Sequence, residues 1–424
     1  MAKSANFKKW FTFVVLVISG GTIFKLSSLK DAFYVPMQEF MGLSHTQIGA
    51  ALSVYGLVQT IGNFASIYIS DRFSKRIMIS LSLVCIGLIG IYISTFPGYM
   101  GILVAWGLLS FFGEVVYWPV LLKAIRLLGD ETEQGRLFGF LEAGRGVVDT
   151  IVAFSALGLF ALLGKGSAAL RGSILFYSGT VILVGIMCYI LVEDDKVAAV
   201  GKDGKEISKN KMAMEGVIQA VKTPEIWVVS LTIASIYSVY CGLTYFIPFL
   251  KDIYGMPVTL VGAYGIINQY GLKMVGGPVG GMLVDKKFKS ATKFLRTALV
   301  VAAVAMVGFI FLPHETMNVY VGMACTLGFG AIIFSMRAVF FAPVDEIRVP
   351  RHISGAAMSI ACIFGYCPQM FAFTLYGSML DRNPGMAGYR LVFTTMIGFA
   401  ILGVIITTIL LKMIKKKQNE VTAA

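Results

Sequence analysis

The chain contains two similar stretches, FYVPMQEFMGLSHTQIGA at 33–50 and YFIPFLKDIYGMPVTLVGA at 245–263, about half its length apart. The matched positions are Pro36 with Pro248, Gly42 with Gly255, Thr46 with Thr259, and Gly49-Ala50 with Gly262-Ala263. Two further blocks in nearly the same register are Tyr55-Gly56-Leu57 with Tyr270-Gly271-Leu272, and Asp71-Arg72 with Asp285-Lys286. Because internal repeats decide architecture, we interpret the chain as two copies of one structural unit.

Each copy consists of apolar segments long enough to cross a bilayer. Hydrophobic residues make up 57% of the chain and charged residues only 14%, too few to cover the surface of a soluble protein. We predict twelve spans, at 10–38, 46–70, 76–95, 98–124, 136–163, 170–192, 225–250, 258–284, 292–312, 316–342, 353–380 and 388–412. The predicted fold is an all-α membrane protein with two six-helix bundles related by pseudo-two-fold symmetry.

Basic residues concentrate in alternate loops between these spans. Those loops carry Lys8 and Lys9, Arg72 to Arg76, Lys123 to Arg136, the 193–224 segment, Lys286 to Arg296, Arg348 and Arg351, and Lys412 to Lys417. Since positive charge gathers on the cytoplasmic side, this asymmetry predicts that both termini are cytoplasmic. The net charge of +13 is therefore an orientation signal, and we expect no nucleic-acid partner.

One long polar stretch separates the two copies of the repeat. It runs over 193–224 and contains charged, glycine and serine residues typical of a solvated linker. The predicted organisation is an N-terminal six-helix bundle at 1–192, a cytoplasmic linker at 193–224 and a C-terminal bundle at 225–424.

Two loop motifs allow the family to be named. ISDRFSKR (69–76) and GGMLVDKKFKS (280–290) resemble the loop motif of the major facilitator superfamily, although the first copy has Ile67 and Ser74 where glycine is usual. The blocks that cover the first and second spans and the seventh and eighth spans are similar to the organophosphate:phosphate antiporter group. The stretch GGTIFKLSSLKDAFYVPMQ (20–38) resembles the YihN-type transporters of enteric bacteria. The resemblance implies the family's fold, alternating access and a bacterial inner membrane.

The same motif supplies candidate gating residues. An aspartate at a helix end can cap a neighbouring helix and pair with a basic residue, and these pairs break when the halves rock. We assign this scaffold role to Asp71, Arg72, Asp285 and Lys286, with direct solute contact as the alternative.

Apart from the charged residues near span ends, which we assign to the loops, nine charged residues lie inside the predicted spans. Each costs about 2.5–3.5 kcal/mol there unless it faces the bundle interior, a partner or a wet cavity. The basic ones are Lys25, Lys30, Arg145, Lys273 and Arg337, and the acidic ones are Asp31, Glu114, Glu142 and Asp149. We predict that Lys30, Arg145, Lys273 and Arg337 contact the solute. The four acidic residues are candidates for proton coupling or for counter-ions.

The spacing of Glu142, Arg145 and Asp149 puts all three on one face of the fifth span. They either form a self-satisfied triad, or Arg145 holds an anion while a flanking carboxylate exchanges a proton. In the first span, Lys25 lies more than a helical turn deeper than Lys30 and Asp31, and we predict that it faces elsewhere.

The eighth span places Lys273 one turn after Gln269 and Tyr270, with Asn268 beside them. No acidic residue lies nearby in sequence, and the first copy of the repeat has no charge there. A lysine beside amide groups suits a carboxylate, sulfonate or phosphate ligand. Pairing of Lys273 with Glu114 or Asp149 is the alternative.

Other polar residues leave two interpretations open. Arg337 is a gate residue or a ligand, and Glu114 couples protons or serves as a counter-ion. Six polar side chains either bind a hydroxylated solute or only pack: Tyr237, Tyr240, Thr244, Tyr245, Tyr366 and Gln369. The antiporter group has a basic residue in its first and seventh helices, but the seventh span here has none before Lys251, which argues against an organophosphate.

These features predict a secondary transporter of a small organic anion, such as a sugar acid, sugar sulfonate or sugar phosphate. The alternative is a transporter-like receptor that senses such an anion. The three histidines fall in loops and the six cysteines have no metal-ligand spacing, so we expect no metal, cofactor or enzymatic activity. The expected partners are the solute and the lipid bilayer, and we expect a monomer.

Overall fold

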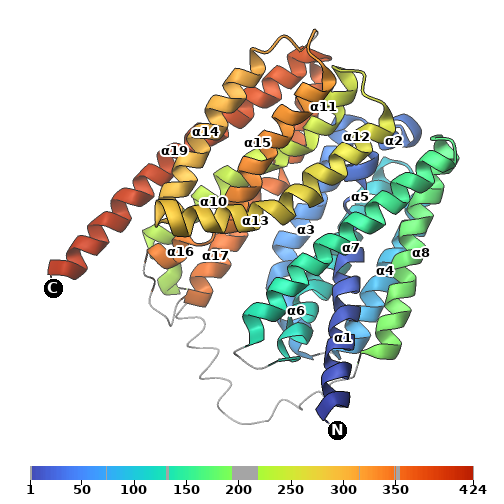
Figure 1. Ribbon diagram of the computed structural model, residues 1–424, viewed down its shortest axis with the longest axis horizontal. Coiled ribbons are helices and arrows are strands. Elements are labelled where there is room, and N and C mark those ends of the chain that lie inside the picture. Colours follow the sequence, from blue (N-terminus) through green and yellow to red (C-terminus); the bar gives the residue numbers. More distant parts are fainter. Residues whose placement is uncertain are drawn as a thin grey trace. The chain divides into compact units, whose positions relative to one another are not determined.

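A computed structural model describes residues 2–72, 74–129, 133–192, 218–314, 316–347, 349 and 354–423. Side chains are not described at 2–7, 64–72, 134–135, 354–355, 418 and 420–423. Most of the linker predicted at 193–224 lies outside these residues. Every regular element in the described part is a helix (Figure 1).

The described residues fall into two compact units, one within Met1–Ala198 and Met256–Gly271, the other within Ala199–Gly255 and Leu272–Ala424. We call them unit 1 and unit 2. The segment Met256–Gly271 groups with unit 1 because its helix packs against helices of the first half. The bundle boundaries at 192 and 225 remain a prediction.

Unit 1 contains the first six predicted spans. Its helices are α1 (Ala2–Thr22), α2 (Leu29–Met41), α3 (His45–Arg72), α4 (Lys75–Ser94), α5 (Tyr99–Ser110), η1 (Phe111–Tyr117), α6 (Trp118–Arg126), α7 (Gln134–Leu162) and α8 (Ser167–Leu191), together with α12 (Val258–Ile266) and η4 (Ile267–Gly271). α4 and α8 lie side by side (Figure 1). α1 also packs against α7, and α3 packs against α5.

Unit 2 contains the remaining helices. They are α10 (Pro224–Gly242), η3 (Leu243–Tyr245), α11 (Phe246–Asp252), α13 (Leu272–Met282), η5 (Leu283–Phe288), α14 (Ala291–Ile310), α15 (Val319–Val339), α16 (Pro343–Glu346), α17 (Ser354–Tyr366), η7 (Cys367–Met370), α18 (Ala372–Arg382) and α19 (Met386–Ala423). α13 packs against α15, while α14 and α10 pack against α19.

Nine helical stretches in the described part are long and apolar enough to cross a membrane, and they match nine of the twelve predicted spans. The other three predicted spans are also helical. The first forms α1 and α2, the second forms α3, and the eighth forms α12, η4 and α13.

Several spans are interrupted where the sequence removes a backbone donor. Pro119 follows the π-helical segment η1, Pro368 lies in the 3₁₀ segment η7, and Pro36 lies three residues after Phe33, whose backbone is not helical. Proline lacks an N–H and clashes with the preceding turn, so the helix widens, tightens or kinks at that point.

The glycine-rich stretch GGPVGG (276–281) permits close helix packing, because its small residues let two helix backbones approach. A Cβ atom on Gly276 of α13 would lie 2.8 Å from the Cβ of Phe334 on α15. The stretch therefore serves the contact between these two helices.

Candidate functional site

The first predicted span is broken at its centre, and the break holds a buried cation. α1 ends at Thr22 and α2 begins at Leu29, with tight turns between them, so Lys25 is not part of a regular helix. Its side chain is 2% exposed, and its Nζ lies 2.7 Å from Oδ1 of Asp149 on α7. Nζ also donates a hydrogen bond to the backbone oxygen of Asp149 at 3.1 Å. We did not predict Lys25 as a contact of the solute. A charged residue inside a span was the sequence signal that could have marked it as a functional candidate.

A second ion pair lies beside the first and is joined to it by one tyrosine. Lys30 and Asp31 pair directly on α2. The hydroxyl of Tyr270, in η4, donates to Oδ2 of Asp31 at 3.2 Å, and the centroid of its ring lies 3.8 Å from Nζ of Lys25. The prediction that Lys25 points away from Lys30 and Asp31 is wrong in its premise, because the helix is not continuous between them.

Arg145 on α7 forms the third pair of unit 1. Its Nη1 lies 2.8 Å from Oε1 of Glu142, and its Nε donates to the backbone oxygen of Gly20 at 3.0 Å. A Cβ atom on Gly20 would lie 3.0 Å from Cδ of Arg145, so the glycine allows this approach. The guanidinium also lies 4.4 Å from the ring centroid of Trp118. The predicted stripe of charges is therefore divided, since Arg145 pairs with Glu142 and Asp149 pairs with Lys25.

Glu114 lies in the π-helical segment η1 and accepts a hydrogen bond of 2.9 Å from the hydroxyl of Tyr55 on α3. Tyr117, at the end of the same segment, hydrogen-bonds Ser19 of α1 at 2.7 Å, and the next residue, Trp118, covers Arg145. The role of Glu114 in coupling remains a prediction.

The amide residues of the eighth span lie in the π-helical segment η4, where both Asn268 and Gln269 are buried. Asn268 is 0% exposed, and neither Nδ2 nor Oδ1 has a hydrogen-bond partner in the described part of the chain. A buried polar group without a hydrogen-bond partner lowers the stability of the folded protein by about 1–3 kcal/mol. Such a side chain is a candidate for a ligand that supplies both a donor and an acceptor.

Lys273 follows in α13, and its side chain is exposed in the described structure. The wider π-helical turn changes the rotation between Gln269 and Lys273, so the shared face expected from a regular helix does not carry over. Its contact with the solute remains a prediction.

Unit 2 holds one arginine in an aromatic setting. The guanidinium carbon of Arg337 lies 4.0 Å from the ring centroid of Tyr240 and 5.4 Å from that of Tyr237. The ring of Tyr366 lies 4.8 Å from that of Tyr237, whose hydroxyl donates to Oε1 of Gln369 at 3.3 Å. No carboxylate in the described residues forms an ion pair with Arg337, in contrast to Lys25, Lys30 and Arg145.

Tyr245, another predicted solute contact, is buried at the end of the 3₁₀ segment η3. Its hydroxyl donates to the backbone oxygen of Phe373, and its ring packs edge to face with Tyr376. These contacts give the residue a packing role, and its contact with the solute stays a prediction.

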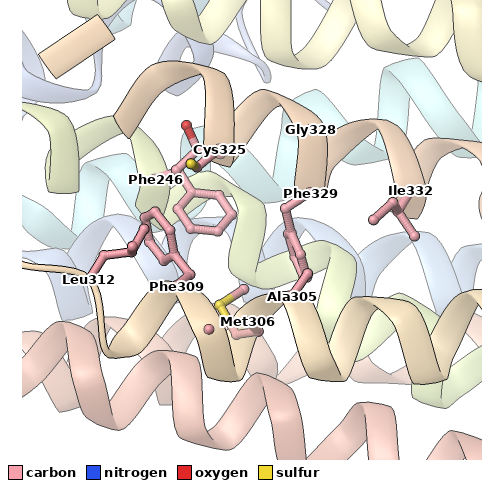
Figure 2. A pocket seen from close by; sticks show the side chains of 11 residues that line it. Phe246, Ala305, Met306, Phe309, Leu312, Cys325, Gly328, Phe329 and Ile332 are labelled. Atoms are coloured by element: carbon pink, nitrogen blue, oxygen red, sulfur yellow. The ribbon is translucent and has the colours of Figure 1, made fainter. Parts of the chain in front are cut away.

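A cavity of unit 2 does not have the chemistry of an anion site. It has a volume of about 500 Å³ and lies among α11, α14 and α15, with Phe246, Phe309, Phe329 and Met306 on its wall (Figure 2). None of the residues that line it is charged. Arg337 and its tyrosines are therefore the better candidate for contact with an anion.

The gating residues are only partly described. The side chains of Asp71 and Arg72 lie outside the described residues, while Asp285 and Lys286 are exposed in η5. Their gating role remains a prediction.

The N-terminus of α14 is capped by Ser290 and by Glu346, a residue that sequence reasoning missed. Glu346 accepts hydrogen bonds from the backbone N–H groups of Ala291 and Thr292 and, at 2.6 Å, from the hydroxyl of Thr292. The matched blocks of the repeat end at Asp71-Arg72 and Asp285-Lys286, so the repeat gave no signal for Glu346. Glu133 pairs with Lys9 at 2.6 Å and with Arg136 at 3.0 Å.

Interrupted spans with charged residues at the breaks are typical of membrane transporters, and the comparisons with known proteins define the family. The chain belongs to the Major Facilitator Superfamily, whose family model matches residues 13–373. It is 50% identical over 417 residues to the inner membrane protein YihN of Escherichia coli (strain K12), covering 98% of this chain and 99% of that protein. It is 28% identical to the inner membrane protein YqcE of the same organism, covering 95% of this chain and 94% of that protein.

Solved structures confirm the fold. A bacterial homologue of the human lysosomal transporter Spinster, in an inward-facing conformation, aligns with a TM-score of 0.76 at 13% identity, covering 96% of this chain and 98% of that one. A D-xylose-proton symporter aligns with a TM-score of 0.69 at 15% identity, covering 94% of this chain and 97% of that one. The prediction of an all-α major facilitator fold is confirmed, and the protein is a multi-pass membrane protein of a transporter family rather than an enzyme.

Proposed function

We propose that this protein is a secondary active transporter of a small hydroxylated organic anion, such as a sugar acid, sugar sulfonate or sugar phosphate. In this proposal the anionic group of the solute binds to Arg337 and is exchanged across the bacterial inner membrane by alternating access. Both termini are cytoplasmic, as the loop charges predict.

One observation carries the proposal: Arg337 is an intramembrane cation that two tyrosine rings cover and that pairs with no carboxylate in the described residues. Cation–π contacts offset the cost of its charge by about 0.5–2 kcal/mol, less than the about 2.5–3.5 kcal/mol that insertion requires. A solute anion would supply the missing counter-charge.

The surroundings of Arg337 favour a solute that also carries hydroxyl groups. Tyr237, Tyr366 and Gln369 present donors, acceptors and aromatic faces near the guanidinium. A separate proposed contact is Asn268 of unit 1, whose carboxamide has a donor and an acceptor with no hydrogen-bond partner among the described residues. A hydroxyl group satisfies either kind of atom. Gln269, Tyr245 and Lys273 remain proposed contacts.

The ion pairs of unit 1 are the proposed coupling groups. Lys25, Lys30 and Arg145 each have a carboxylate partner, so an anion that binds one of these cations competes with Asp149, Asp31 or Glu142. A carboxylate that loses its cation is more readily protonated, which links proton binding to anion binding. Exchange against a second anion at the same cations is the other form of coupling, and Glu114 is a further candidate proton carrier.

The test is uptake of labelled solutes into proteoliposomes that contain the purified full-length protein. The panel consists of D-gluconate, D-glucuronate, a sugar sulfonate, D-glucose 6-phosphate and neutral D-glucose, each under a proton gradient and under an anion gradient. We expect uptake of at least one anion and none of D-glucose. Absence of uptake for every anion contradicts transport, and saturable binding without uptake favours the receptor alternative.

A further inference from the structure

Unit 1 contains a cavity whose chemistry the proposed transport mechanism does not use. It has a volume of about 620 Å³ and lies where α1 and the first turn of α4 meet the last turn of α8. The residues that line it are Lys8, Phe11, Thr12, Arg76, Ile190, Leu191 and Val192. Both charged residues in this lining are cations.

Arg76 is held in a fixed orientation but is incompletely satisfied. Its guanidinium carbon lies 4.3 Å from the ring centroid of Tyr189 on α8, so the ring supports the plane of the side chain. Its Nε is buried and has no hydrogen-bond partner in the described part of the chain. Arginine presents five N–H donors in a planar fork that fits the oxygen atoms of a phosphate.

The rim of the cavity is apolar and accessible. Phe11 is 44% exposed, Tyr189 is 51% exposed and Ile190 is 69% exposed. Tyr189 and Ile190 lie in the last turn of α8, and Phe11 lies near the middle of α1. In a membrane protein, exposed apolar surface of this kind contacts lipid. A soluble phosphate would use only the cations, whereas a phospholipid would use the cations with its headgroup and the apolar rim with its acyl chains.

We propose that this cavity binds the headgroup phosphate of an anionic phospholipid, with Arg76 and Lys8 on the phosphate and with Phe11 and Ile190 against the acyl chains. Basic pockets at the ends of transmembrane helices on the cytoplasmic side are suited to such headgroups. The proposal does not depend on which solute the protein transports.

The acidic residues Glu193, Asp194 and Asp195 follow Val192 in the sequence and lie outside the described residues. The alternative to a lipid is that a carboxylate of this segment pairs with the two cations. The experiment therefore includes a variant in which all three are neutralised.

The experiment measures thermal unfolding and native mass spectra of the purified full-length protein in a neutral detergent. Added probes are phosphatidylglycerol, phosphatidylethanolamine and inorganic phosphate. We expect phosphatidylglycerol to raise the melting temperature and to remain bound in the mass spectrum, and the other two probes to have little effect. Arg76→Gln should raise the dissociation constant for phosphatidylglycerol about tenfold, as expected for loss of a charge-assisted contact of about 1.5 kcal/mol.

The matched control is Arg126→Gln, which removes an exposed cation of α6 and should leave lipid binding unchanged. Lys8→Gln replaces Arg76→Gln if the latter does not fold. Equal binding of phosphatidylglycerol by wild type and by the Arg76 and Lys8 variants overturns the proposal, and so does equal stabilisation by inorganic phosphate. If phosphatidylglycerol binds only to the triple variant E193Q, D194N and D195N, the cavity is assigned to the linker, and this result also overturns the proposal.

Discussion

Nζ of Lys25 lies 2.7 Å from Oδ1 of Asp149, and the lysine side chain is almost completely buried. The pair connects the break in the first span to the middle of α7. Charges in such a place are stable only together, so each residue of the pair should depend strongly on the other.

Asp149→Ala should lower the free energy of unfolding by about 3–5 kcal/mol, because it leaves a buried lysine without a partner. The double variant Lys25→Met with Asp149→Leu should recover most of that loss. Thermal or denaturant unfolding of the purified variants measures both effects. A double variant as unstable as Asp149→Ala alone would show that the pair is not coupled.

Tyr270→Phe keeps the ring over Lys25 but removes the hydrogen bond to Asp31. We expect a loss of about 0.5–1.5 kcal/mol, as for a typical hydrogen bond. Tyr270→Leu should cost about 0.5–2 kcal/mol more, because the cation–π contact is also lost. In a double-mutant cycle with Lys25→Met, the extra cost of the leucine variant should disappear, and its persistence would refute the cation–π contribution.

Glu346→Ala should destabilise unit 2 by about 1–2 kcal/mol, because it removes the acceptor of the first N–H groups of α14. Asp345→Ala is the matched control, since Asp345 is the exposed neighbour of Glu346. Hydrogen exchange of the first turn of α14 should increase in the Glu346 variant alone. Equal exchange in both variants would contradict the cap.

His314, in the turn between α14 and α15, should make stability depend on pH. Its Nε2–H donates to the backbone oxygen of Phe309 at 2.7 Å, so the neutral Nδ1 accepts from the hydroxyl of Tyr254 at 2.7 Å. Burial raises the pKa of Tyr254 to about 12, so this hydroxyl remains protonated. The neutral imidazole is therefore the form that fits the turn.

Burial also lowers the pKa of His314 below its ordinary value. Around pH 6 the unfolded chain then binds more protons than the folded one, so stability falls as the pH drops through the ordinary histidine pKa of about 6.5. The loss ends below the pKa of the folded protein. The melting temperature, measured between about pH 5 and 8, should show this decline in wild type and in His45→Gln but not in His314→Gln. An unchanged decline in His314→Gln would assign it to another group.

The sequence predicted the fold well, because span length, loop charge and the repeat depend only on composition and order. It also identified the charged residues inside spans, since charge is rare there. It did not predict the partners of Asp149 or the place of Lys25, because both follow from the break between Thr22 and Leu29. The aromatic cover of Arg337 arises from α10 and α15 and has no local signal.

The central claim is that Arg337 holds the anionic group of the solute. The most direct measurement is the thermal shift of the purified protein with the anion panel, repeated with Arg337→Gln, Arg145→Ala, Lys273→Ala and, as a control on an exposed arginine of unit 2, Arg382→Gln. We predict that the anion that stabilises wild type also stabilises the Arg382 variant and fails to stabilise Arg337→Gln. Equal stabilisation of Arg337→Gln and wild type would contradict the claim.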